Sequence, residues 1–445
     1  MAKTNDQDML AIAQSCIAIA KSAGAGDASA RAYRVRDVSL DYRDGKVEKI
    51  SESTTRGVIL QLYVDGRFST VSTSDLRPEA LKTFIGDTIP VARAIAPDPF
   101  RVLPDAALFK GQSSANLQLE DPKYFGVTAD EGRKAAKETH DAARAVKGSE
   151  AILSVTSSFS SNLVENWMVT SNGFSGANRS TSFFVSAGVS AKDNDGRRPE
   201  EYDYAGSRIW GPVPDAASIG ASAAQRTLRR LGSKKGATNA MTVLVDNRAV
   251  GRLVGMLGGA LTAASLQQKR PLFEGKLGQQ VISPLVSITD DPLVPGGFGS
   301  RKFDNEGIAA KPRIVFENGV LKSYYVDTYY GRKLKMEPTS GSTSNLSWKL
   351  GTKSQKELLA EAKDALLITS FIGGNSNSGT GDFSVGVVGF LVRNGEIAEP
   401  VAEMNLSGNH LEFWKKLVAI GNDPFPYSAM RSPTLMFENV SVAGT

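Results

Sequence analysis

Asn-Gly and Asp-Gly pairs stand between runs of alternating apolar and polar residues, and they constrain the fold more than any other feature. Both residues of such a pair tolerate the left-handed backbone that two-residue β-hairpin turns need. The pairs lie at Asp44-Gly45, Asp65-Gly66, Asn172-Gly173, Asn318-Gly319 and Asn394-Gly395. The sequence therefore predicts antiparallel sheets whose consecutive strands pair through tight turns.

The first predicted domain spans residues 1–104 and combines helices with strands. Apolar residues recur at helical spacing over residues 9–20, with Cys16 on the apolar face, so we expect a buried core thiol. A second helix is expected over residues 75–96. Between the helices, alternating runs predict strands at 32–41, 47–53, 57–64 and 68–72. This pattern indicates an antiparallel sheet with flanking helices.

The second predicted domain spans residues 122–232. Thr128 and Glu131 fit the capping box T-x-x-E, which predicts a helix through residue 146. The alternating runs that follow predict strands at 152–159, 163–170 and 180–190. A helix is expected at 215–231, ending at Gly232, with arginines in its last turns that suit the helix dipole. The polar segment SKKG at 233–236 is expected to link this domain to the next.

The third predicted domain spans residues 237–445 and is β-rich. Its first helix is expected at 248–267, and four glycines fall on it: Gly251, Gly255, Gly258 and Gly259. Since each glycine costs a helix about 1 kcal/mol relative to alanine, we expect this helix to pack closely against a neighbouring backbone. A late helix is expected at 411–420 and a final strand at 434–442. The predicted fold class is α+β, with an N-terminal antiparallel sheet, flanking helices and a C-terminal β-rich domain.

Composition excludes several function classes. Cys16 is the only cysteine, so no intrachain disulfide forms, as is usual in a reducing, cytoplasmic setting. His140 and His410 are the only histidines, and their separation excludes a two-histidine zinc helix. The net charge of +5 is slight for 445 residues and argues against nucleic acid as a ligand. There is neither a signal-peptide pattern nor a run of about 18 apolar residues, so no membrane association is expected.

The remaining polar motifs each admit a plain structural interpretation. His140 lies on a polar helix and is expected at the surface, and His410 is expected near a helix cap. The pair Asp290-Asp291, with Asp304 and Glu306, can coordinate a hard cation through oxygen. Turns starting at Asp291-Pro292 and at 304–307 are the favoured interpretation. The glycine-rich segment 296–300 lacks the lysine of a phosphate-binding loop.

The stretch 373–384, GGNSNSGTGDFS, is the candidate ligand site. Glycines leave backbone donors and acceptors unobstructed, so such a loop can receive an extended peptide by strand-like pairing. A plain flexible loop is the alternative. The candidate peptide-binding residues are Gly374, Asn375, Asn377, Gly379, Asp382 and Ser384.

Several of these segments resemble the TldD/PmbA family, most strongly from residue 240 onward. The matching motifs are LGQQV at 277–281, ITDDP at 288–292, FDNEG at 303–307, ENGVL at 317–321, SGTGDFS at 378–384, NGEI at 394–397 and GND at 421–423. The resemblance implies a paired proteolytic system, in which the TldD member is a zinc metallopeptidase with an HExxxH helix and a distal cysteine ligand. The TldE, or PmbA, member is similar in fold and lacks those ligands.

The resemblance places this chain with the TldE/PmbA members. Counted back from 277–281, the two histidine positions fall on Val254 and Gly259, and the glutamate position falls on Gly255. The region after residue 423 has no cysteine. The resemblance thus implies a non-catalytic subunit with no catalytic or metal-binding residue and no cofactor of its own, leaving open whether this chain alone is an enzyme.

By the same resemblance, zinc belongs to a TldD-like partner, the assembly is a cytoplasmic heterodimer, and the substrates are peptides and unfolded segments. Without the partner, a homodimer is an option. The alternative function is a binding or modulator protein, as the family's association with DNA gyrase modulation suggests. A hydrolase with an unrecognised nucleophile is a third option, for which the sequence shows no base–nucleophile spacing.

Overall fold

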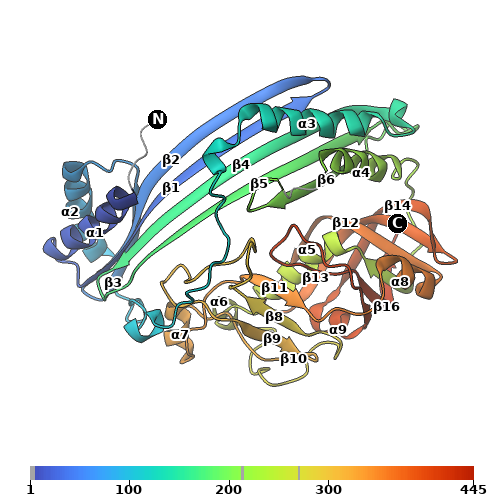
Figure 1. Cartoon of the computed structure of the whole chain (residues 1–445). Coiled ribbons are helices and arrows are strands. Elements are labelled where there is room, and N and C mark those ends of the chain that lie inside the picture. The colour runs from blue at the N-terminus through green and yellow to red at the C-terminus, as the bar shows by residue number, and fades with distance from the viewer. Residues whose placement is uncertain (1–5, 212–214, 269–270, 445) are drawn as a thin grey trace.

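The upper layer of the molecule is a six-stranded antiparallel sheet in the order β3-β2-β1-β4-β5-β6 (Figure 1). The computed structural model describes residues 6–211, 215–268 and 271–444, so the ends of the first and third predicted domains, residues 1–5 and 445, lie outside it. The strands are β1 Asp27–Arg43, β2 Lys46–Val64, β3 Arg67–Thr73, β4 Ile152–Thr170, β5 Ser175–Ala191 and β6 Glu200–Ser207. Because β1 pairs with β4 from Ser29↔Thr170 to Arg43↔Thr156, one sheet joins strands from residues 1–104 and 122–232.

Two predicted strand breaks are wrong, because β2 and β4 run without interruption. Gly57, the first residue of the second short strand predicted for β2, lies inside β2 and not at its start. A Cβ there would lie 2.7 Å from the Tyr33 Oη and 2.8 Å from the Thr73 carbonyl oxygen, so glycine allows close packing inside the sheet. In β4, Asn162 pairs with Asp37 on one side and Ser182 on the other, although its polar neighbours resemble a turn.

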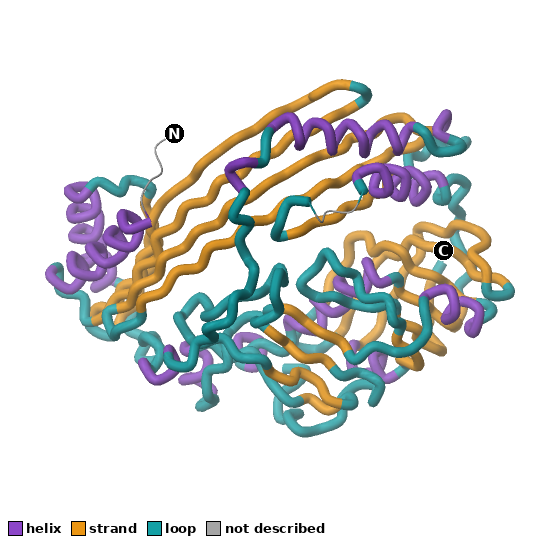
Figure 2. Tube along the Cα trace, in the orientation of Figure 1, coloured by secondary structure: helices purple, strands orange, loops and turns teal. Residues whose placement is uncertain are grey.

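Two pairs of helices cover one face of this sheet (Figures 1 and 2). Helices α1 Asp6–Ser22 and α2 Pro78–Ala94 pack at one end, and α3 Ala129–Arg144 and α4 Ala216–Leu228 pack at the other. Cys16 is fully buried in the α1 core, where burial raises the pKa of its thiol to about 11, so the prediction of a core thiol is confirmed. The capping box of Thr128 and Glu131 is also confirmed.

His140 is buried rather than at the surface, so that prediction is wrong. It lies one turn from Ala136 on the face of α3 that packs on the sheet. Its ring meets the ring of Tyr42 edge to face, with centroids 5.2 Å apart. Because most residues of α3 are polar, its few buried positions could not be recognised from composition.

The lower layer contains two sheets. The larger has the order β14-β13-β12-β7-β16-β15, and an added β14–β16 pairing closes five of its strands into a ring. Its strands are β7 Asn239–Val245, β12 Ala365–Ser376, β13 Asp382–Arg393, β14 Glu396–Asn409, β15 Leu417–Ile420 and β16 Leu435–Ala443. The smaller has the order β10-β9-β8-β11 and comprises β8 Ile288–Asp291, β9 Arg313–Glu317, β10 Val320–Leu321 and β11 Asn345–Trp348. The predicted α+β class with a β-rich C-terminal region is confirmed.

The two helices predicted in the C-terminal region are shorter than expected, and α7 and α8 were not predicted. The helices described there are α5 Asn247–Gly259, α6 Ala263–Leu266, α7 Thr328–Leu334, α8 Gln355–Ala362 and α9 His410–Lys415. The single helix predicted at 248–267 divides because Thr262 caps a new helix, its hydroxyl accepting from the Ser265 N–H at 3.2 Å. The helix predicted at 411–420 stops at Lys415, because Leu417–Ile420 pairs with β16 instead.

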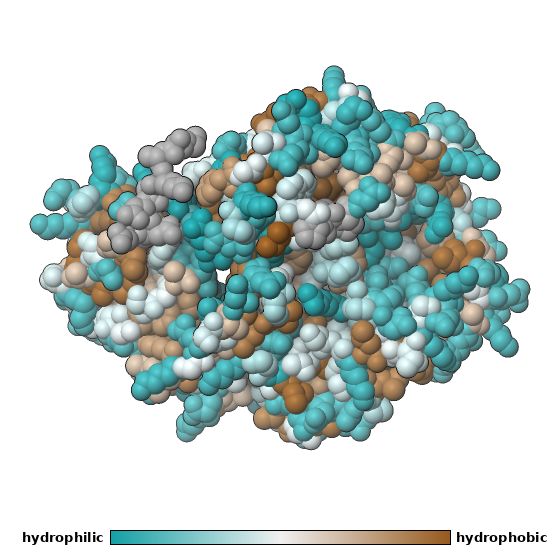
Figure 3. All heavy atoms as spheres, viewed as in Figure 1, coloured by the Kyte–Doolittle hydropathy of each residue, from teal (hydrophilic) through white to brown (hydrophobic). Residues whose placement is uncertain are grey.

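The two layers contact each other through aromatic and polar side chains. The Phe184 ring stacks on the Phe298 ring with centroids 5.3 Å apart, and Arg31 donates to the Asn305 side-chain oxygen at 3.1 Å. The face drawn in Figure 3 is mostly polar, with apolar residues scattered over both layers. Within the described ranges, no helix is long and apolar enough to cross a membrane.

Candidate functional site

Helix α5 follows strand β7 and is anchored by one face in the C-terminal core. Asp246 caps the helix by accepting from the Arg248 N–H at 3.0 Å. Val250, Leu253 and Leu257 are buried against the core. Gly251, Gly255 and Gly259 recur every four residues, so they share a second face of the helix.

The glycines of α5 do not pack against a neighbouring backbone, so that prediction is wrong. A Cβ built on Gly258 or Gly259 would meet nothing within 4 Å. Cβ atoms on Gly251 and Gly255 would meet only the flexible thioether of Met430, at 3.5 and 3.7 Å. The glycines therefore leave open space beside the helix.

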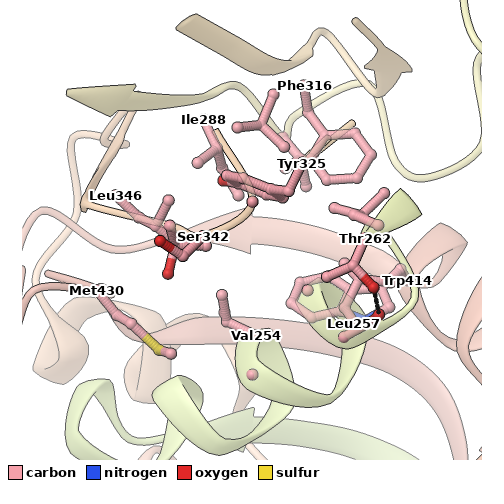
Figure 4. Close-up of a pocket in the computed structure, with 18 residues that line it drawn as sticks. Val254, Leu257, Thr262, Ile288, Phe316, Tyr325, Ser342, Leu346, Trp414 and Met430 are labelled. Atoms are coloured by element: carbon pink, nitrogen blue, oxygen red, sulfur yellow. Dashed lines mark hydrogen bonds between the residues drawn. The ribbon is translucent and has the colours of Figure 1, made fainter. Parts of the chain in front are cut away.

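That space includes an apolar cavity of about 290 Å³ (Figure 4). In Figure 4, Val254 and Leu257 of α5 lie on one side, and Ile288, Phe316 and Tyr325 lie across from them. The full lining is Val254, Gly255, Leu257, Gly258, Gly259, Leu261, Thr262, Val286, Ile288, Val315, Phe316, Tyr325, Gly341, Ser342, Thr343, Leu346, Trp414 and Met430. The cavity thus lies between α5, the smaller sheet and the C-terminal segments.

The three positions carried over from the family's zinc helix all line this cavity. Val254, Gly255 and Gly259 have no side-chain nitrogen, oxygen or sulfur, whereas a catalytic zinc needs about three such protein ligands. Among the described residues, no group of three or more His, Cys, Asp or Glu side chains is placed to hold a metal ion. The residues present at these positions do not fit a zinc ion.

A groove of about 490 Å³ adjoins the cavity and shares Gly255 and Gly259 with it. Its second wall belongs to β12, so two of the predicted peptide-binding residues, Gly374 and Asn375, lie opposite α5. Arg252 bridges the walls, its Nη2 donating to the Gly373 carbonyl oxygen at 2.8 Å. The structure therefore brings the predicted segment close to the α5 positions that the resemblance assigns to the zinc helix.

The other predicted peptide-binding residues make internal contacts. The Asn377 side-chain oxygen accepts from the Gly379 N–H at 2.8 Å, which closes the turn between β12 and β13. Asp382 accepts from Thr380 and Asn409, and these hydrogen bonds hold the pKa of its carboxyl below the usual range. Ser384 donates to the Asn405 side chain at 3.2 Å. The segment is therefore a hairpin with an ordered turn, not the loop that its composition suggests.

The predicted acidic turns are confirmed, and one carboxyl is unusual. Asp304 accepts from the Glu306 and Ile308 N–H groups at 2.9 and 3.0 Å. Burial, with Asp304 and Asp327 adding negative charge nearby, raises the pKa of Glu306 to about 7. Asp290 is fully buried and accepts from the Ser344 N–H at 2.8 Å.

Sequence reasoning missed most of the cavity wall. Trp414 and Met430 come from the C-terminal end of the chain, and the Met430 carbonyl is held by the Trp348 indole N–H at 3.2 Å. Such scattered apolar residues carry no local signal, so only the glycine spacing of α5 could have pointed to this site.

Together, the fold and the site define a two-layer α+β protein with an apolar cavity beside the glycine face of α5. Three regions match, in order, domain 1 (residues 28–96), the central domain (122–231) and the C-terminal domain (238–444) of PmbA/TldA metallopeptidases. The chain belongs to the PmbA/TldD family.

Curated relatives and solved structures agree with this assignment. A metalloprotease PmbA of Escherichia coli O157:H7 is 28% identical over 410 residues, which is 92% of this chain and 90% of that protein. A Bacteroides thetaiotaomicron crystal structure, described as a candidate modulator of DNA gyrase, is 36% identical with a TM-score of 0.95, covering 99% of this chain and all of that one. TldE from Thermococcus kodakarensis shares the fold at 18% identity, with a TM-score of 0.84 over 97% of this chain and all of that one.

Proposed function

We propose that this chain is the non-catalytic TldE/PmbA-like subunit of a cytoplasmic zinc metallopeptidase that degrades or processes peptides and unfolded segments. A TldD-like partner supplies the zinc and the catalytic residues in a heterodimer. The observation that carries the proposal is that Val254, Gly255 and Gly259, which the resemblance assigns to the histidine and glutamate positions of the peptidase helix, line an apolar cavity and carry no metal-binding side chain.

A subunit without metal still has physical roles in such a pair. It can complete the walls around the partner's site, exclude water and hold that site in shape. The groove between α5 and β12 supports a part in handling the substrate, because the resemblance assigns the family's active-site helix to α5, which forms one wall of this groove. The fold shared with a protein described as TldE is compatible with this role.

The test compares peptide hydrolysis by this chain alone, by a TldD-like partner alone and by the two together. We expect chelator-sensitive hydrolysis of unstructured peptides by the pair, and none by this chain. The matched control is the pair with an inactivated partner, its zinc-helix glutamate changed to glutamine, which should also be inactive. Hydrolysis that persists in that control would overturn the proposal.

A second function rests on the descriptions of two solved relatives as candidate modulators of DNA gyrase. The net charge of +5 gives this function little electrostatic support. DNA binding that weakens steeply with salt would favour it, since displaced counterions accompany protein–phosphate contacts. Absence of such binding, together with partner-dependent hydrolysis, would leave the peptidase subunit as the better account.

A further inference from the structure

Strand β12 has an uncovered edge beside α5. On one side β12 pairs with β13 as far as Ser376↔Phe383. On the other side its pairing with β7 ends at Ile368↔Val245, after which the chain of β7 turns into α5. Gly373 and Gly374 have positive φ and interrupt the register of β12, and beyond them no strand in the described part of the chain pairs with this edge over Asn375 and Ser376, which line the groove. An extended peptide can add to such an edge through its own backbone.

Arg252 gives this groove a positive charge and closes one of its ends. It is the only charged residue among the described lining, which otherwise consists of Gly251, Gly255, Met256, Gly259, Gly374, Asn375, Ser376 and Ser378. Its hydrogen bond to the Gly373 carbonyl places the guanidinium across the strand edge, so a paired peptide has to end there. A guanidinium favours a carboxylate, which it can bind through charge-assisted hydrogen bonds. The chain end that suits this place is therefore a C-terminus.

The apolar cavity adjoins the groove from one helical turn past Arg252. Gly255, one helical turn after Arg252, lines both the groove and the cavity, and so does Gly259. The cavity of about 290 Å³ is at the lower limit of the roughly 300–1,000 Å³ typical of small-molecule sites, so it suits a single large side chain. Phe316, Leu346 and Trp414 give it an apolar interior.

We propose that the groove binds the C-terminal end of an extended peptide whose last residue is large and apolar. The peptide backbone pairs with the β12 edge, the terminal carboxylate binds Arg252, and the terminal side chain enters the cavity. This inference rests on the proposed role in peptide handling and specifies which peptide this chain itself holds.

The test measures binding of a fluorescein-labelled peptide, Gly-Ser-Thr-Ser-Gly-Phe, to the full chain by fluorescence anisotropy. Four forms are compared: the free acid, its C-terminal amide, the same peptide ending in Ser, and an amide with Glu in place of the fourth residue. We expect the free acid to bind at least about tenfold more tightly than each of the others, as the loss of a charge-assisted hydrogen bond or a buried aromatic side chain implies. Equal binding of acid and amide, tight binding of the Glu-containing amide, or no binding of the free acid would overturn the proposal.

Matched variants test whether binding depends on the groove itself, and not on the loss of any positive charge or on a leucine at any open helical glycine. Arg252→Ala should weaken binding of the free acid about tenfold and abolish the difference between acid and amide. Arg56→Ala removes the same charge from an exposed position on β2 and should change neither. Gly259→Leu should fill the space beside α5 and abolish binding, whereas Gly86→Leu, at another open helical glycine, should not. Unchanged acid–amide discrimination in Arg252→Ala would also overturn the proposal.

The binding experiment and the hydrolysis experiment test two claims that can be wrong independently of each other. If the pair hydrolyses peptides but this chain alone binds none of the four forms, the inference is wrong and the proposed function stands. If this chain binds the free acid as described but no partner-dependent hydrolysis is found, the proposed function is wrong and the binding site stands.

Discussion

The Nε2 atom of His410 lies 3.0 Å from the Oγ atom of Ser376, at the start of α9 and beneath the β12–β13 hairpin. The imidazole is buried and stacks on the Phe383 ring, with centroids 4.6 Å apart. This contact joins the hairpin that lines the groove to the C-terminal core, and it agrees with the structural role near a helix cap that the sequence predicts.

The buried His410 should make the protein sensitive to acid. Burial lowers the pKa of its imidazole from 6.5 to about 4. Between these values the unfolded chain binds the proton and the folded chain does not, so stability is retained above pH 6.5 and lost as the pH falls toward 4. His410→Gln should remove about 2 kcal/mol of the stability difference between pH 7 and pH 4.5, as measured by urea unfolding. An identical loss in the wild type and the variant would contradict this assignment.

Glu306 should make the protein less stable as the pH rises, which is the opposite of the effect of His410. Its pKa is raised to about 7 in the folded protein, mainly by burial, from 4.5 in the unfolded chain. The folded state therefore keeps the proton that the unfolded state loses, so this contribution to stability is present below pH 4.5 and is lost as the pH rises through 7. Glu306→Gln should gain about 2 kcal/mol relative to the wild type between pH 5 and pH 8 in urea unfolding. A constant difference across that range would show that Glu306 titrates normally.

The open face of α5 predicts an unusual response to alanine. Gly258→Ala should stabilise the protein by about 0.5–1 kcal/mol, because the added methyl group meets nothing within 4 Å and alanine favours the helix. Gly220→Ala is the matched control on α4, where a Cβ would lie only 1.8 Å from the Thr139 carbonyl oxygen. That substitution should be clearly destabilising. Thermal unfolding of both variants is the measurement, and a loss of stability in Gly258→Ala would mean that the face is packed after all.

Local signals predicted the hairpins but not the way the strands assemble. At Asp44-Gly45 and Asn394-Gly395 both residues have positive φ, as the turns between β1 and β2 and between β13 and β14 require. The pairing of β1 with β4 joins Arg34 to Glu165 across 131 residues, and nothing in either segment alone specifies that partner. Long-range pairing depends on how whole strands bury their faces, which a local pattern does not record.

The candidate site, like the fold, was only partly predictable from the sequence. The spacing of glycines marked α5, and the composition of 373–384 marked the strand opposite it, so two of the groove's walls were visible in the sequence. The prediction that the α5 glycines pack against a backbone was wrong, because they leave open space. Of the two interpretations of 373–384, the plain flexible loop does not hold, because the segment forms a hydrogen-bonded hairpin around Asn377. Trp414 and Met430 complete the cavity only because the fold brings the C-terminal segments back to α5.

The most direct measurement is the zinc content of the purified chain, by elemental mass spectrometry after incubation with excess zinc and extensive dialysis. With Val254, Gly255 and Gly259 beside the cavity, the account predicts only background zinc in the lone chain and stoichiometric zinc in the assembled pair. Stoichiometric zinc retained by the lone chain, together with hydrolysis of a peptide by that chain, would contradict it.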